Sequence, residues 1–115
     1  VVMARAQAES PRMVRDVLLA NCGLIDKTSQ SVVRVASAVG REAPHRLIAA
    51  TLGLPEPRII EALRDAVDND LLVPVPTSGT YRFRHALVAE AVYSTLLPGE
   101  REELHERLAA ASAAP

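Results

Sequence analysis

The amino-acid sequence predicts a mainly α-helical domain that carries a small β-hairpin. Of the 115 residues, 49% are hydrophobic but only 3% are aromatic, and there is no Trp. The core must therefore be built from Leu, Val, Ile and Ala. Apolar residues recur at helical spacing in successive segments, and between residues 71 and 84 the period changes to that of strands.

The first ordered element is expected to begin at Ser10 and Pro11. Residues 1–10 are small or polar and show no period, so they are interpreted as a tether or as the end of a preceding domain. Ser10 suits a helix N-cap and Pro11 suits the first helical position. A first helix is predicted from this point to Cys22, where Gly23 stops it.

Three short helices are predicted to follow in tandem, over residues 28–39, 44–52 and 56–70. Gly40 and Gly53 supply the stops for the first two of them. Their apolar stripes are, in order, Val32, Val35, Ala36 and Val39; Leu47, Ile48 and Leu52; and Ile59, Ile60, Leu63 and Val67. Such a series indicates a tri-helical core.

A two-stranded hairpin is predicted after the fourth helix. Residues 71–75 are largely apolar, residues 77–80 have turn chemistry, and residues 81–84 alternate aromatic with cationic side chains. Pro74 and Pro76 lack an amide hydrogen, which confines their strand to a sheet edge. A hairpin that projects from a tri-helical core is a winged helix, so residues 11–97 are assigned to a winged-helix domain.

Two further helices are predicted to follow the wing. Residues 85–97 contain only one charged residue, Glu90, so this helix is expected to be covered on most sides. Pro98 and Gly99 are expected to break it, and residues 100–114 form a last amphipathic helix through Leu104, Leu108 and Ala111. Residues 98–115 are therefore treated as a separate C-terminal helix.

Several function classes are disfavoured by the residues that are missing. The formal net charge is -1, and Lys27 is the only lysine, so the chain has no phosphate loop of its own. Cys22 has no cysteine partner, the three histidines show no metal-ligand spacing, and no catalytic motif occurs. We therefore expect a cytoplasmic, non-catalytic domain without a metal or membrane span. Both chain ends look like cuts within a larger protein.

DNA binding is the best-known use of a winged helix, and Arg58, Arg82 and Arg84 are the candidate contacts. The helix that would enter the major groove is the one over residues 56–70. This helix has two positively charged residues and five negatively charged ones, so its net charge is -3. The positive residues are Arg58 and Arg64, and the negative ones are Glu56, Glu61, Asp65, Asp68 and Asp70. Because phosphate contacts supply most of the affinity for DNA, this sign disfavours direct DNA binding.

His85 stands at a position suited to anion contact. It opens the helix after the hairpin and follows Arg82 and Arg84 closely. A helix N-terminus offers free amides and a partial positive charge, so these three side chains form a candidate anion-facing corner. The alternative is that His85 is an ordinary N-terminal residue bonded to a neighbouring carbonyl.

The run from Tyr81 to Tyr93, Tyr-Arg-Phe-Arg-His-Ala-Leu-Val-Ala-Glu-Ala-Val-Tyr, resembles a segment of bacterial STAND-class signal-transduction ATPases. The likeness continues through Leu96 to Pro98 and Arg101 to His105, and weaker likeness extends over residues 11–112. The class includes large LuxR-type ATP-binding transcriptional regulators and adenylate-cyclase-linked ATPases. Related proteins have Met-His-Asp where this chain has Arg84, His85 and Ala86.

The resemblance implies a regulatory role rather than catalysis. In that family a winged helix packs on the protein's own nucleotide-binding domain, which holds ADP or ATP, and is followed by helical repeats. The residue that matches His85 is expected to contact the diphosphate of ADP and stabilise the inactive state, with Arg84 and Arg82 beside it. The whole protein could oligomerise. Besides DNA binding, one alternative stays open: a helical protein-interaction module formed by residues 85–114.

Overall fold

The structure, a computed structural model, describes residues 25–113 and contains five helices and three short strands in that range. The helices are α3 (Lys27–Val39), α4 (His45–Leu52), α5 (Glu56–Asp68), α6 (Ala86–Thr95) and α7 (Pro98–Ala113); the strands are β1 (Ala43–Pro44), β2 (Leu72–Val75) and β3 (Thr80–Phe83). The expected mainly helical class with a small hairpin is confirmed. The tether and the first predicted helix, at Ser10–Cys22, lie outside the described residues.

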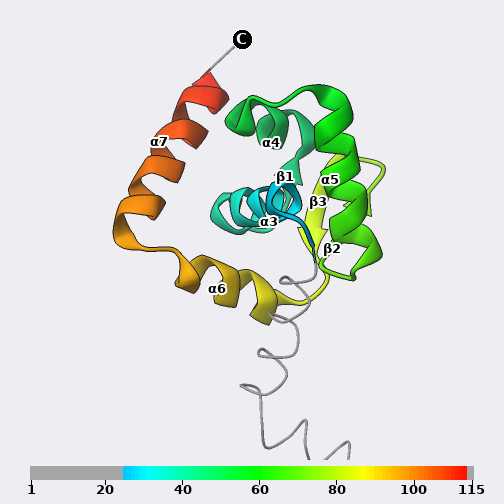
Figure 1. Ribbon diagram of the computed structural model, residues 1–115. Coiled ribbons are helices and arrows are strands. Elements are labelled where there is room, and N and C mark those ends of the chain that lie inside the picture. The colour runs from blue at the N-terminus through cyan, green and yellow to red at the C-terminus, as the bar shows by residue number, and fades with distance from the viewer. Residues whose placement is uncertain (1–24, 114–115) are drawn as a thin grey trace, which may run out of the picture.

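Helix α3 occupies the centre, and the other helices surround it (Figure 1). Asp26 caps its N-terminus, because its carboxylate accepts a hydrogen bond of 2.8 Å from the backbone N–H of Ser29. Val32, Val35 and Ala36 are buried as the predicted stripe requires. Val33 is buried as well, since α3 has neighbours on more than one side.

Helices α4 and α5 are joined by the three residues 53–55. Gly53 adopts a left-handed conformation with φ 66°, which favours glycine at this helix end. Helix α5 buries Ile59, Ala62, Leu63 and Ala66, spaced i, i+3, i+4 and i+7. Ile60 was expected on this face, but its side chain is 50% exposed, because it lies about 100° around the helix from Ile59.

The three strands form an antiparallel sheet with β3 in the middle and β1 and β2 at its edges. The predicted hairpin is the pair β2 and β3, and Pro74 lies on an edge strand as expected. The sequence did not predict β1, which has only two residues and is too short to show an alternating pattern. Ala43 and Pro44 of β1 lie opposite Tyr81 and Thr80 of β3.

Helix α6 buries only Val88, Ala91 and Val92, so the expectation that it is covered on most sides is wrong. It packs on α3 and β3, and the opposite side, which includes Leu87 and Glu90, is exposed. Its apolar sequence therefore reflects an uncovered face as well as a core contact.

Helix α7 begins at Pro98 itself, where a break was expected. Proline is tolerated at the first position of a helix because its missing N–H would have no helical partner there. The Glu100 carboxylate accepts a hydrogen bond of 2.7 Å from the backbone N–H of Leu97, as in a capping box. Leu108 anchors the helix in the core. None of the helices within residues 25–113 is both long and apolar enough to cross a bilayer.

Candidate functional site

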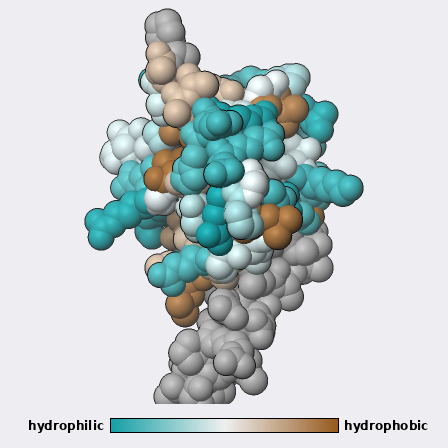
Figure 2. Space-filling model, turned by 90° about the vertical axis from the view of Figure 1, so that its left-hand side faces the viewer, coloured by the Kyte–Doolittle hydropathy of each residue, from teal (hydrophilic) through white to brown (hydrophobic). Residues whose placement is uncertain are grey.

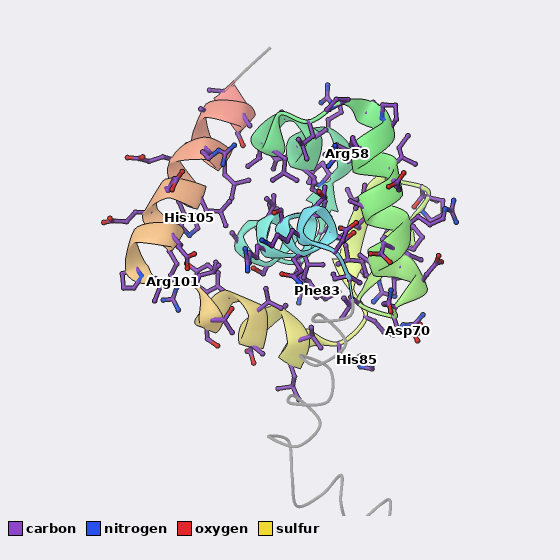
Figure 3. All side chains as sticks on the ribbon, viewed as in Figure 1. Arg58, Asp70, Phe83, His85, Arg101 and His105 are labelled. Atoms are coloured by element: carbon purple, nitrogen blue, oxygen red, sulfur yellow. The ribbon has the colours of Figure 1, made fainter. Side chains whose placement is uncertain are left out.

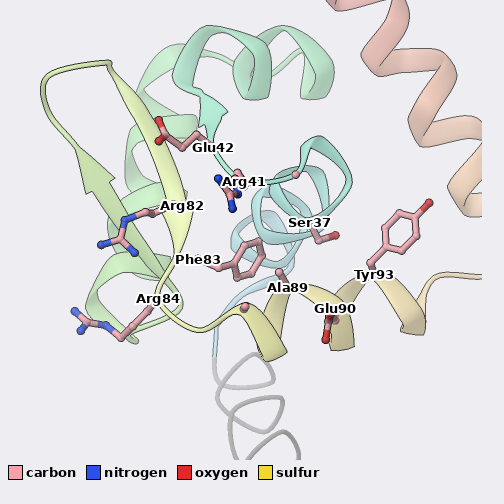
Figure 4. Close-up of a pocket in the computed structure, with 11 residues that line it drawn as sticks. Ser37, Arg41, Glu42, Arg82, Phe83, Arg84, Ala89, Glu90 and Tyr93 are labelled. Carbon is pink, nitrogen blue, oxygen red and sulfur yellow. The ribbon is translucent and has the colours of Figure 1, made fainter.

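A groove lies where the end of α3, strand β3 and the start of α6 meet (Figure 4). Its volume is about 710 Å³. The end of α3 and the following turn contribute Ser37, Gly40, Arg41 and Glu42; β3 and the next residue contribute Arg82, Phe83 and Arg84; α6 contributes Ala86, Ala89, Glu90 and Tyr93. Segments far apart in the sequence thus form one surface.

The floor of the groove is mainly apolar. Phe83 belongs to the core and is only 8% exposed, while Ala89 and Tyr93 of α6 are half-buried. Strand alternation explains the placement of Phe83, because neighbouring residues of β3 point to opposite faces and Arg82 is therefore exposed. The floor can receive an apolar group from a ligand or partner.

Arginines stand at the margin of this floor. Arg41 lies between the hairpin and α3, and Arg82 and Arg84 extend from the outer side of the hairpin (Figure 4). The Nε atom of Arg84 lies 3.6 Å from a carboxylate oxygen of Asp70, and both side chains are largely exposed. Such a pair contributes little, so Arg84 stays available to another anion.

Two carboxylates also line the groove, but they differ in their surroundings. Glu42 accepts hydrogen bonds from the hydroxyls of Thr80 at 2.6 Å and Ser78 at 3.3 Å, so it is held toward the hairpin turn. Glu90 is exposed on α6, at the side of the groove away from the hairpin (Figure 4). Positive charge therefore dominates the hairpin side, and negative charge marks the α6 side.

His85 lies beside the groove but does not line it. It is the N-cap residue of α6, in an extended conformation, and its side chain makes no capping hydrogen bond. Its ring is exposed at the end of the molecule where Asp70 also lies (Figure 3). Of the predicted trio, the structure brings Arg82 and Arg84 to the groove and leaves His85 on an adjoining surface.

Arg58 lies far from Arg84, another of the candidate DNA contacts. It is in the first turn of α5, whereas Asp70, the neighbour of Arg84, follows the last turn. At 1.5 Å per residue the helix separates these ends by roughly 18 Å, and Figure 3 shows Arg58 and Asp70 at different ends of α5. Arg58 donates a hydrogen bond of 3.1 Å to the Thr28 hydroxyl.

The carboxyl group of Asp26, near Arg58, has a lowered pKa. The hydrogen bond from the Ser29 backbone N–H, with a contribution from the charge of Arg58, holds the pKa of Asp26 below its ordinary value of 3.8. This is the signature of a helix cap and not of catalysis. Arg58 therefore interacts with the N-terminal end of α3, through the Thr28 hydroxyl and the charge of Asp26.

The other two histidines are engaged in contacts within the chain. His45 lies 3.0 Å from a carboxylate oxygen of Glu56, and His105 lies 2.9 Å from the hydroxyl of Tyr93. Within residues 25–113, no three His, Cys, Asp or Glu side chains are grouped so that they could hold a metal ion. His85, by contrast, makes no side-chain hydrogen bond to another residue within 25–113 and is exposed.

Arg41 lines the groove but is not among the site residues predicted from the sequence. The pairing of Ala43 with Tyr81 and of Pro44 with Thr80 runs antiparallel, so the residues just before Ala43 lie next to those just after Tyr81. This register carries Arg41 to Phe83 and Arg82. Arg41 could have been predicted from the sequence only if β1 and its pairing with β3 had been predicted.

No protein-family model, curated protein or solved structure matches this chain. A function for the groove and for His85 therefore depends on their geometry and charge.

Proposed function

We propose that this chain is a non-catalytic winged-helix module that regulates a larger ATP-dependent switch protein of the LuxR type in the cytoplasm. In this proposal it packs on a neighbouring nucleotide-binding domain and stabilises the ADP-bound, inactive state. The nucleotide is held mainly by that domain, and His85, with Arg84 and Arg82 nearby, faces its phosphates. Helical repeats would follow α7.

The order of the elements supports the winged-helix assignment. Helices α4 and α5 are joined by a short turn that contains Gly53, as in a helix-turn-helix pair. Strand β1 precedes this pair and the hairpin of β2 and β3 follows it, with β3 central in the sheet. Helix α3 completes a tri-helical core, and the hairpin takes the place of the wing.

The observation that carries the regulatory proposal is that the first turn of α5 is hydrogen-bonded within the chain, whereas His85 is exposed and makes no capping hydrogen bond. In a DNA-reading helix-turn-helix, the N-terminal residues of the second helix contact base edges. Here Glu56 contacts His45 and Arg58 contacts Thr28, so the first turn of α5 is bonded to its own chain. His85, the N-cap residue of α6, is exposed next to Arg84 at the opposite end of the molecule from the first turn of α5. This pair of side chains suits a partner that carries anionic groups.

A helical protein-interaction module is the less favoured alternative. Figure 2 shows the face that carries α7 as mostly hydrophilic, with hydrophobic residues in separate small spots. The large exposed apolar side chains of α6 and the α6–α7 link are Leu87 at 41% and Leu97 at 65% exposure. Isolated apolar side chains of this kind are common on monomeric proteins and do not form an extended binding patch.

The test uses a full-length protein that carries this chain. We expect His85→Ala to release ADP faster and to raise basal activity, because a contact made only in the inactive state is lost. His105→Ala is the matched control, since His105 bonds to Tyr93 between α6 and α7. Unchanged ADP affinity in the His85→Ala protein would contradict the proposal.

A gel shift with the isolated chain and duplex DNA at low salt tests the DNA-binding alternative. We expect no retardation, because α5 is acidic and its first turn is engaged. Retardation that disappears with added salt and with Arg82→Ala would instead support DNA binding through the wing.

A further inference from the structure

We infer that the groove between α3, β3 and α6 binds a short acidic segment of a partner protein, with an apolar side chain on its floor and carboxylates on its arginine margin. This inference goes beyond the proposed function, because His85 does not line the groove. The two sites would share Arg82 and Arg84 at their boundary, but the nucleotide would face His85 and the peptide would lie on the apolar floor of the groove.

The floor of the groove suits an apolar side chain of a partner. Phe83, Ala89 and Tyr93 present apolar surface inside a groove of about 710 Å³, which lies in the size range of ligand sites in proteins. The ring of Phe83 is fixed by the core below it, so the floor is preformed. One or two large apolar side chains of a peptide would bury surface here, and apolar burial is the main source of peptide affinity.

The hairpin side of the groove carries positive charge. Arg41 and Arg82 form no ion pair with any other residue in the range 25–113, and the contact of Arg84 with Asp70 is long and exposed. The Arg41 guanidinium lies between the hairpin and α3, beside the apolar floor, whereas those of Arg82 and Arg84 extend to solvent from the outer side of the hairpin, away from Phe83 (Figure 4). Guanidinium binds carboxylate through paired hydrogen bonds, so this margin is complementary to Asp and Glu side chains.

The carboxylates of the groove disfavour a nucleic-acid backbone as its occupant. Glu90 stands on the α6 side of the groove, where the second row of phosphates would meet a like charge. Glu42 adds a further negative charge at the turn. A peptide avoids both, because its acidic side chains can point to the hairpin while its apolar side chain lies over Ala89 and Tyr93.

The experiment measures binding of a short fluorescein-labelled peptide to the 115-residue chain by fluorescence anisotropy. The peptide carries two Leu at helical spacing between Asp and Glu residues. We expect Arg41→Glu to weaken binding about tenfold or more, the effect of losing one charge-assisted contact. Arg64→Glu is the matched control: it makes the same charge change on the exposed side of α5, outside the groove, and is expected to change affinity by less than about twofold.

A second variant tests the floor separately from the margin. Ala89→Glu keeps a good helix former in α6 but places a carboxylate on the apolar floor, and it is expected to abolish binding while the circular dichroism spectrum is unchanged. In the ¹⁵N spectrum of the native chain, the peptide should shift the amides of Arg41, Phe83 and Ala89. A peptide with Lys in place of Asp and Glu should not bind.

Three results would overturn the inference. Equal weakening by Arg41→Glu and Arg64→Glu would show binding to overall charge, and amide shifts confined to other surfaces would place the peptide elsewhere. Displacement of the peptide from the groove by duplex DNA at the same salt concentration would reassign the groove to nucleic acid. His85→Ala should leave peptide binding intact, so failure here and failure of the ADP experiment are separate outcomes.

Discussion

The hydroxyl of Tyr93 and the Nε2 atom of His105 lie 2.9 Å apart, and this hydrogen bond joins α6 to α7. The guanidinium of Arg101 lies over the Tyr93 ring, 4.6 Å from its centre. Tyr93 also lines the groove, so the same residue connects the last two helices and forms part of the candidate binding surface.

Tyr93→Phe should lower the free energy of unfolding by about 0.5–1 kcal/mol, because it removes one partly exposed hydrogen bond and keeps the ring under Arg101. Urea unfolding followed by circular dichroism measures the change. The control is Tyr81→Phe, since the Tyr81 hydroxyl makes no hydrogen bond within residues 25–113. Equal losses in the two variants would contradict a specific Tyr93–His105 contribution.

Asp70→Gly should stabilise the chain by about 1 kcal/mol. Asp70 has φ 61°, and it follows α5 at the position where glycine is usual. The backbone N–H groups of Asp70 and Leu71 donate to Val67 and Ala66, which is the hydrogen-bond pattern of a Schellman motif. Glycine adopts this conformation without steric cost, and the lost contact with Arg84 is weak.

Thermal unfolding of Asp70→Gly and of Asp68→Gly provides the comparison. Asp68 is the last residue of α5, with ordinary helical geometry, so glycine there should destabilise. A lower melting temperature for Asp70→Gly than for the native chain would show that the ion pair with Arg84 outweighs the backbone strain.

The cap at Asp26 should make stability depend on pH. The folded-state pKa of Asp26 lies below 3.8, so the ionised carboxylate stabilises the folded chain above that pH. This contribution is lost as the pH falls through the folded-state pKa. Asp26→Ala should therefore be less stable than the native chain at neutral pH, and the difference should shrink in acid.

Urea titrations over this pH range measure the effect, with Asp26→Asn as the control. Asparagine can accept the hydrogen bond from Ser29 but does not titrate, so the Asn variant should lose less stability in acid than the native chain. A constant gap between the native chain and Asp26→Ala at every pH would contradict the assignment.

Leu108→Ala should destabilise the chain by about 2–3 kcal/mol, because it empties a buried position. Leu108 is only 8% exposed and is the buried residue of α7, so the attachment of this helix to the core depends on it. Leu97→Ala makes the same substitution at a side chain that is 65% exposed, and it should cost less than about 0.5 kcal/mol. Chemical denaturation of both variants provides the measurement, and similar losses would contradict the packing of α7.

Local patterns were enough to predict most elements. The stripe through Val32, Val35 and Ala36 predicted α3, and the alternation around Phe83 with Pro74 at an edge predicted the hairpin. These signals are contained within a few consecutive residues. The exposure of Ile60 was missed because an isoleucine beside an apolar stripe looks the same whether or not a neighbour covers it.

The candidate site depended on contacts that the sequence does not encode locally. Arg82 and Arg84 were found from the sequence because they lie in one strand and its extension, and His85 because it opens a helix. Arg41 could not be found in this way, since a two-residue strand brings it to Arg82 from another part of the chain.

The sequence by itself determined a mainly helical, aliphatic domain with a small hairpin, an acidic α5 and no phosphate loop, because composition and period follow from neighbouring residues. Only the tertiary structure decided that Arg58 lies apart from Arg84, that α6 is covered on one side, and that Arg41 joins Phe83 and Tyr93 in a groove. The physical reason is that these relations depend on how elements pack across long separations in the chain. Hydrophobic patterning states which face of a helix or strand is buried but not which partner buries it.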